Sequence, residues 1–262
     1  MIGIVGNGFV GNAVYQNLRD KVQCKVFDVD KNRSLNTLGE VVNQEFIFVC
    51  LPTPMKKSGE CDLSIMDDFF EELPDFIEGT FVIKSTVPIG TTKKYSERHN
   101  VIHNPEFLTA RNAVADFANS ERNIIGGDME LAVDFARFYE QCFPNIPSIL
   151  VTSDESEAIK YFSNTFLAYK VAYFNKMYDM CKAIGLDYDS VREGVTADSR
   201  IGQSHTVVPG IDNDRGFGGT CFPKDLNSLI VQMESNGVNP EILRKVWEYN
   251  QEIRSVVDWI VT

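Results

Sequence analysis

Residues 2–11 of the chain read IGIVGNGFVG, a short strand-like run that enters three glycines spaced G-x-G-x-x-G. The sequence after the glycines continues as an expected helix to Leu18. In such a strand, turn and helix, Gly6 permits the tight turn, Gly8 lets the backbone approach a pyrophosphate, and Gly11 allows close helix packing. The helix N-terminus adds free N–H groups for phosphates. The stretch therefore predicts a dinucleotide-binding turn rather than a turn that is merely tight.

An acidic residue stands where such a unit recognises the ribose. The second expected strand, 25–27, ends at Asp28, about 20 residues after the first glycine. A carboxylate there accepts hydrogen bonds from the adenosine ribose and disfavours a 2′-phosphate, so NAD is favoured over NADP. The expected cofactor-binding residues are Gly6, Gly8, Phe9, Val10, Gly11, Asp28, Thr53 and Thr86.

Outward from this stretch, short β-branched or aromatic runs alternate with amphipathic segments. The predicted strands are residues 2–5, 25–27, 46–51, 81–85, 123–126 and 148–151. Such alternation predicts an α/β fold, a Rossmann-type parallel sheet covered by helices. We expect this NAD-binding domain to occupy residues 1–152.

A long helix is predicted next. Thr152 and Glu155 have the spacing of a capping box, and apolar residues recur at helical steps until Gly185 offers a C-cap. At 1.5 Å per residue this spine helix would be about 45 Å long. We expect it to lead an all-helical domain, residues 153–262, and to form a homodimer interface.

Composition excludes several partners. The 262-residue chain carries a formal net charge of −12, which argues against nucleic acid. Its six cysteines form no C-x-x-C pair, so we expect no metal site and a reduced, cytoplasmic protein. No apolar stretch is long enough for a membrane, and we expect no signal peptide ahead of the strand-like segment that begins at Ile2.

A reactive thiol is predicted in residues 216–225, GFGGTCFPKD. Cys221 follows a glycine-rich loop and precedes a proline suited to a helix start. The helix N-terminus and Lys224 would both favour the thiolate, which is the nucleophilic form. A buried, inert thiol is the usual alternative and suits Cys24, Cys50 and Cys181. With NAD, an activated thiol suggests oxidation of an aldehyde through a thioester.

Two polar residues lie together on the predicted spine helix. Lys160 and Asn164 are four residues apart and therefore share one face. Taken alone, such a pair is most often a solvated surface feature.

Taken in order, these motifs resemble the UDP-glucose/GDP-mannose dehydrogenase family. The resemblance rests on residues 6–11, Asp28, KSTVPIG at 84–90, NPEFL at 104–108, KYFSNTFLA at 160–168 and GGTCFPKD at 218–225. It implies a four-electron oxidation of a nucleotide-sugar C6 alcohol to a uronate, with two NAD and a cysteine thioester, in nucleotide-sugar and polysaccharide metabolism.

The resemblance also implies roles for individual residues. Cys221 would be the nucleophile, Lys160 and Asn164 would stabilise developing oxyanions, and Asp225 would partner a lysine or water. Glu106 would be the base for thioester hydrolysis, and Thr86 would position water. The implied substrate-binding residues are Glu106, Phe107, Leu108, Lys160, Asn164, Arg200 and Gly218. A surface salt bridge is the alternative for Arg200.

The chain departs from the family pattern twice. Ala110 stands where the family usually has a second glutamate. The family also continues into a third domain that binds the nucleotide, whereas this sequence ends at Thr262. We therefore expect that a separate chain supplies that domain, that the substrate is smaller or is held differently, or that the full reaction has been lost.

Two other functions remain open from the sequence. A β-hydroxyacid dehydrogenase also pairs a dinucleotide domain with a helical one, but it does not need Cys221. A non-catalytic NAD-binding dimer would leave Lys160, Asn164, Cys221 and Asp225 without a purpose.

Overall fold

The computed structural model describes residues 1–259, and the chain divides into two compact units. Unit 1 comprises residues 1–53 and 62–160. Unit 2 comprises residues 54–61 and the chain from Tyr161 onward. The expected domain boundary at residue 152 stays a prediction.

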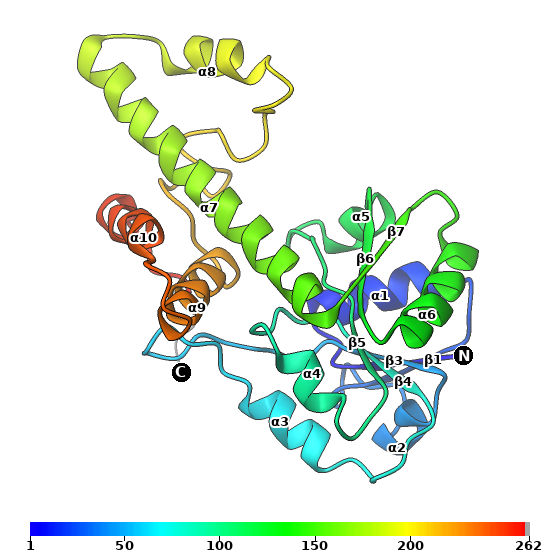
Figure 1. Cartoon of the computed structure of the whole chain (residues 1–262). Helices are drawn as coiled ribbons and strands as arrows, with labels where there is room; N and C mark the ends of the chain where they lie inside the picture. Colours follow the sequence, from blue (N-terminus) through cyan, green and yellow to red (C-terminus); the bar gives the residue numbers. More distant parts are fainter. Residues whose placement is uncertain (260–262) are drawn as a thin grey trace. The chain divides into compact units, whose positions relative to one another are not determined.

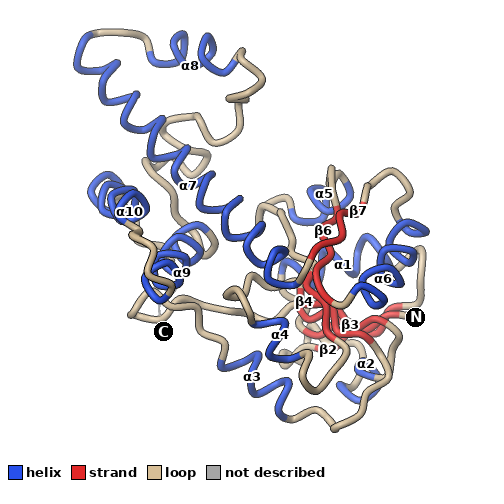
Figure 2. Tube along the Cα trace, in the orientation of Figure 1, coloured by secondary structure: helices blue, strands red, loops and turns tan. Residues whose placement is uncertain are grey.

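Unit 1 is built on a seven-stranded sheet, drawn in red in Figure 2. Its order is β2-β1-β3-β4-β5-β6-β7. The strands are β1 (Ile2–Val5), β2 (Cys24–Phe27), β3 (Phe46–Val49), β4 (Thr80–Ile83), β5 (Val101–His103), β6 (Asn123–Gly127) and β7 (Ser148–Val151). Neighbouring strands are parallel except β5 and β6, which are antiparallel. The sheet is therefore parallel, as predicted, except for the antiparallel pair of β5 and β6.

Six of the seven strands were predicted within two residues at each end. The exception is β5, which has only three residues, all buried. Three residues are too few to show a periodic pattern, and this explains why the sequence did not reveal the strand.

Helices cover both faces of this sheet (Figure 1). The helices α1 (Phe9–Leu18), α5 (Ala113–Ala118) and α6 (Met129–Cys142) share one apolar core with the strands. The helices α2 (Leu38–Val42), α3 (Ser64–Glu71) and α4 (Thr91–Tyr95) belong to a second core. Two separate cores are expected because a buried strand sends alternate side chains to opposite faces.

The spine helix α7 runs from Ser153 to Ile184, as predicted. Its first turn is closed by a capping box: the Thr152 N–H and hydroxyl donate to Glu155 Oε2, both at 2.8 Å, and the Glu155 N–H donates to Thr152 Oγ1 at 3.3 Å. The helix stops at Gly185, which has a φ of +76° that suits glycine.

Unit 2 is helical. It contains α7 from residue 161 onward, α8 (Tyr188–Thr196), α9 (Phe222–Ser235) and α10 (Glu241–Ile253). The later part of α7, α9 and α10 share an apolar core that includes Ala168, Leu226 and Val246. A long loop joins α8 to α9, and it includes the glycine-rich segment that was predicted to precede Cys221. The expected fold class, a Rossmann-type α/β domain followed by helices, is confirmed.

None of the helices within residues 1–259 combines the length and the apolar character needed to cross a membrane.

Candidate functional site

The glycine turn of unit 1 is closely packed on one side and open on the other. A Cβ on Gly6, whose φ is +86°, would lie 2.7 Å from the Cys50 carbonyl oxygen, and one on Gly11 would lie 1.8 Å from the Gly6 oxygen. A Cβ on Gly8 would meet no atom within 4 Å. Backbone therefore fills the space behind the turn, while the space beside Gly8 can admit a ligand.

The N-terminus of α1 suits an anion. Gly8 is its N-cap, no side chain caps the helix, and its first turn contains no acidic residue. The first amides of a helix have no partner within the helix, so those of Phe9, Val10 and Gly11 suit a pyrophosphate. The buried Asn7 Oδ1 has no hydrogen-bond partner among residues 1–259, which leaves an acceptor in the same turn.

Asp28 lies beside this turn, directly after β2. Its Oδ2 accepts a 2.6 Å hydrogen bond from the Asn7 N–H, and its Oδ1 accepts one of 2.8 Å from the Asp30 N–H. Because both carboxylate oxygens are held by backbone, the side chain is fixed before any ribose binds. The residues of the turn and Asp28 thus fit a dinucleotide.

Thr53 and Thr86 lie after β3 and β4, at the carboxyl ends of neighbouring parallel strands. The Thr53 hydroxyl donates to the Thr86 carbonyl oxygen at 2.9 Å, and both residues are buried. Ligands of doubly wound folds bind at this end of the sheet.

A buried ion pair joins Glu106 to Lys160. Their side chains are only 7% and 3% exposed, and Lys160 Nζ lies 3.3 Å from Glu106 Oε1. Lys160 also donates to the Glu106 carbonyl oxygen, and Glu106 Oε2 accepts from the Leu108 N–H at 2.6 Å. The Phe107 ring centroid lies 5.1 Å from Lys160 Nζ. The structure therefore brings these four predicted residues together.

Lys84 was not predicted as a site residue. Its Nζ donates to Asn104 Oδ1 at 2.7 Å, and burial lowers the pKa of Lys84 to about 8. The sequence signal was present, since a lysine directly follows the buried run of β4. A buried lysine near Glu106 makes this part of unit 1 unusually rich in charge.

In unit 2, a second buried polar cluster surrounds Asp225. Its Oδ1 lies 2.6 Å from Lys224 Nζ, and its Oδ2 accepts from Asn164 Nδ2 at 2.6 Å. Burial opposes the charge on Lys224, but the Asp225 carboxylate raises the pKa of that lysine above its ordinary value. Because Asp225 lies 2.6 Å from Lys224 Nζ, it is the direct counter-charge of this lysine.

Cys221 is the N-cap of α9, with a proline in the first turn of the helix, and it is half-buried. Burial raises the pKa of Cys24 to about 11 and that of Cys50 to about 12, so these two remain thiols. Partial exposure at a helix N-terminus is where a reactive cysteine is expected.

Two further predicted substrate-binding residues, Arg200 and Gly218, belong to unit 2. Arg200 has an 88% exposed side chain and forms an ion pair with Asp198 at 2.5 Å, the surface salt bridge that was its alternative. Gly218 lies in the loop before Cys221, where a Cβ would fall 2.1 Å from Arg254 Nη2.

Two family profiles match the chain. The NAD binding domain of the UDP-glucose/GDP-mannose dehydrogenase family matches residues 33–142. The central domain of the same family matches residues 154–252.

Curated relatives agree with the profiles. UDP-glucose 6-dehydrogenase TuaD of Bacillus subtilis is 32% identical over 308 residues, covering 100% of this chain and 65% of that protein. UDP-glucose 6-dehydrogenase of Rickettsia felis is 34% identical over 265 residues, covering 95% of this chain and 57% of that protein. The chain thus spans less than two thirds of the length of either relative.

Solved structures share the fold. A UDP-glucose dehydrogenase from Pyrobaculum islandicum matches with a TM-score of 0.82 and 27% identity over 96% of this chain and 68% of that one. A Mycobacterium tuberculosis 3-hydroxyisobutyrate dehydrogenase matches with a TM-score of 0.76 over 98% of this chain and 95% of that one, but at 18% identity it shows the fold alone. The profiles and the curated relatives show that the chain belongs to the UDP-glucose/GDP-mannose dehydrogenase family and carries its NAD-binding and central domains.

Proposed function

We propose that the chain oxidises the C6 alcohol of a nucleotide sugar to the uronic acid, as the name UDP-glucose 6-dehydrogenase describes for its relatives. The observation that carries the proposal is Cys221 at the N-terminus of α9, since a simple alcohol dehydrogenase has no use for a nucleophilic thiol. A β-hydroxyacid dehydrogenase would likewise leave it idle.

NAD supplies the hydride acceptor in this proposal. The amides at the start of α1 would hold its pyrophosphate, and Asp28 would accept hydrogen bonds from its adenosine ribose. Thr53 and Thr86 would line the cofactor's position at the carboxyl ends of β3 and β4.

The first oxidation removes a hydride from C6 and a proton from its hydroxyl, which gives the aldehyde. A second hydride departs after the Cys221 sulfur has added to the aldehyde carbon as a thiohemiacetal, and a thioester remains. Water then attacks the carbonyl, the carbon–sulfur bond breaks, and the acid and the thiol are released. Each turnover therefore consumes two NAD and one water.

The charged residues suit the polar steps of this sequence. We assign to Lys160, and to the Asn164 amide as a second donor, the stabilisation of oxyanions. Glu106 acts as base for thioester hydrolysis, and Thr86 positions the water. Asp225 holds Asn164 and Lys224 in place through its two carboxylate oxygens.

Substrate contacts are assigned to a further group. Phe107, Leu108 and Gly218 would contact the sugar, and Arg200 would bind a phosphate or the product carboxylate. Asp198 engages Nε and Nη2 of the exposed Arg200 guanidinium, so an incoming anion would compete with this ion pair.

The test is a mass-spectrometric search for a covalent adduct on Cys221 after incubation with NAD and a panel of UDP- and GDP-sugars. NADH formation is followed in parallel for the wild type and Cys221→Ser. An adduct whose mass matches one sugar nucleotide, with a second NADH per sugar that the wild type forms and Cys221→Ser does not, is the expected result. NAD binding without NADH or adduct would sink the proposal, and turnover of small hydroxy acids by Cys221→Ser would replace it with β-hydroxyacid dehydrogenase activity.

We further propose that the protein acts as a homodimer through α7.

A further inference from the structure

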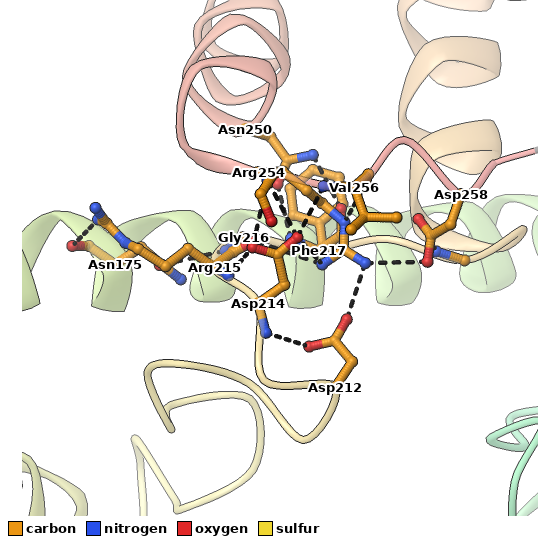
Figure 3. A network of polar contacts seen from close by, with 12 residues as sticks. Asn175, Asp212, Asp214, Arg215, Gly216, Phe217, Asn250, Arg254, Val256 and Asp258 are labelled. Carbon is orange, nitrogen blue, oxygen red and sulfur yellow. Dashed lines mark hydrogen bonds and ion pairs between the residues drawn. The ribbon is translucent and has the colours of Figure 1, made fainter.

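The loop before Cys221 is held by side chains from the C-terminal end of α10 and the residues after it (Figure 3). Asn250, on α10, is fully buried and brackets the backbone of Phe217. Its Oδ1 accepts from the Phe217 N–H at 2.7 Å, and its Nδ2 donates to the Phe217 oxygen at 2.9 Å. A side chain that pairs with both backbone groups of one residue fixes that residue in place.

Arg254, which follows α10, connects three segments of unit 2. Its side chain is 2% exposed, and its Nη2 lies 2.8 Å from Asp212 Oδ2 and 3.0 Å from Asp258 Oδ2. Its Nη1 donates to the Arg215 carbonyl oxygen at 3.4 Å. A buried guanidinium needs such partners, because leaving the charge unpaired is costly.

Asp258 extends this network to the loop itself. While its Oδ2 faces Arg254, its Oδ1 accepts from the Gly219 N–H at 2.9 Å. Gly219 lies two residues before Cys221. The Asp258 carboxylate therefore links the loop before Cys221 to the buried side chain of Arg254.

The glycines of the loop are fitted to these side chains. A Cβ on Gly216 would fall 2.3 Å from Asn250 Oδ1, and one on Gly218 would fall 2.1 Å from Arg254 Nη2 and 2.3 Å from Asp258 Oδ1. The absence of side chains lets the loop lie directly on Asn250, Arg254 and Asp258. The loop backbone is therefore closely packed against these three side chains.

We propose that Arg254 and Asp258 are positioning residues that hold the loop at 216–219 so that α9 begins with Cys221 half-buried. The inference rests on the proposed function only in taking Cys221 as the nucleophile. Because Cys221 is the N-cap of a helix, the path of the preceding loop decides where the thiol lies relative to the first amides of α9.

The test compares Asp258→Ala with Asp258→Asn in the 262-residue chain. The alanine variant loses the acceptor for the Gly219 N–H, whereas asparagine keeps an acceptor and loses only the charge. Lys245→Gln is the matched control, since it removes an exposed ion pair with Glu248 on the same α10 helix. Arg254→Lys is a second variant that keeps the buried charge but not the fork of donors.

The first readout is the rate at which iodoacetamide alkylates Cys221, measured by peptide mass spectrometry with buried Cys181 as internal reference. Losing a hydrogen bond to a charged group frees the loop, so Asp258→Ala raises this rate roughly tenfold, and Asp258→Asn raises it less. Lys245→Gln leaves it unchanged. The second readout is NADH formation, in which kcat falls for Asp258→Ala while the KM for NAD does not move.

The two readouts separate this inference from the proposed function. A wild-type alkylation rate in Asp258→Ala overturns the inference, even if the wild type forms NADH. A raised rate with no NADH or adduct in the wild type keeps the inference and rejects the proposed function. If Asp258→Ala does not fold, Arg254→Lys decides by the same alkylation rate.

Discussion

Gly8 and Gly11 stand three residues apart in one turn, yet a methyl group at each meets different surroundings. At Gly11 it would overlap the Gly6 carbonyl oxygen, which is backbone and cannot rotate away. Gly11→Ala should therefore cost more than about 3 kcal/mol of folding free energy. Thermal unfolding of this variant against the wild type measures the loss.

At Gly8 the space is open, and its φ of −73° is available to alanine. Gly8→Ala should keep its stability within about 1 kcal/mol of the wild type. The methyl would stand where we place the pyrophosphate, so NAD affinity should fall roughly tenfold or more. Calorimetric titration with NAD checks this, and unchanged affinity in a folded Gly8→Ala would move the cofactor away from the turn.

His103 is a buried histidine that the structure keeps neutral. Its Nδ1 lies 2.9 Å from Ser156 Oγ, its Nε2 lies 3.4 Å from the Ser85 oxygen, and burial lowers the pKa of His103 to about 3. An unfolded histidine binds its proton near pH 6.5. Stability from this group is therefore complete above about pH 6.5 and is lost as the pH falls toward 3.

The expected loss is about 1.4 kcal/mol per pH unit over that window, on top of the contribution of carboxylates. His103→Asn keeps an acceptor for the Ser156 hydroxyl and removes the titrating ring. Urea unfolding at several pH values should show a shallower acid slope for His103→Asn than for the wild type. Equal slopes would mean that protonation of His103 does not oppose folding.

Individual residues also show how much of the site could be predicted from the sequence. The glycine turn, Asp28 and Cys221 have fixed local spacings, so a sequence shows them directly. Lys84 was missed because its role depends on burial against Asn104, twenty residues away. The contacts of Arg254 with Asp212 and Arg215 join residues about forty positions apart, on the two sides of α9 and α10, and no periodic pattern encodes them.

At the scale of elements, the sequence predicted a capping box at the start of α7, and the structure contains it. The Thr152 hydroxyl accepts from the Glu155 N–H, and Glu155 Oε2 accepts from the Thr152 N–H. Thr152→Ala removes one half of this box and should cost about 1 kcal/mol of stability.

Ser153→Ala is the control for that change, since within residues 1–259 the Ser153 hydroxyl donates one hydrogen bond, to the neighbouring Asp154 at 3.5 Å. In urea unfolding, Thr152→Ala should be less stable than Ser153→Ala by most of the loss of about 1 kcal/mol expected for a missing N-cap. Equal stability of Thr152→Ala and Ser153→Ala would show that tertiary packing alone starts the helix.

Elements whose signal is local were predictable, and those set by distant contacts were not. α7 combines a cap, a long apolar period and a terminal glycine, so both of its ends were predicted. The reversal between β5 and β6 depends on how the chain returns to the sheet after α5, which a strand's own residues do not record.

At the scale of the whole molecule, α7 carries a row of exposed aromatic side chains that suggests a protein contact surface. Within unit 2, Phe162, Phe166, Tyr169 and Tyr173 are each between 42% and 64% exposed. Their steps of four, three and four residues place them on one face of the helix. A row of exposed aromatic side chains marks a contact surface, and an identical copy of the same helix is its simplest complement.

We therefore expect the 29.5 kDa chain to be a dimer in solution, and Phe166→Glu to convert it to a monomer. A charge buried against the same charge of a second copy opposes association, while the 64% exposure of Phe166 means that the unit itself loses little packing. Ile242→Glu is the control, because it places the same charge on a 68% exposed apolar residue of α10. Multi-angle light scattering should give a dimer mass for the wild type and Ile242→Glu and a monomer mass for Phe166→Glu, with similar melting temperatures. A monomeric wild type would contradict the homodimer, and we would then expect the exposed aromatic face of α7 to bind a different protein.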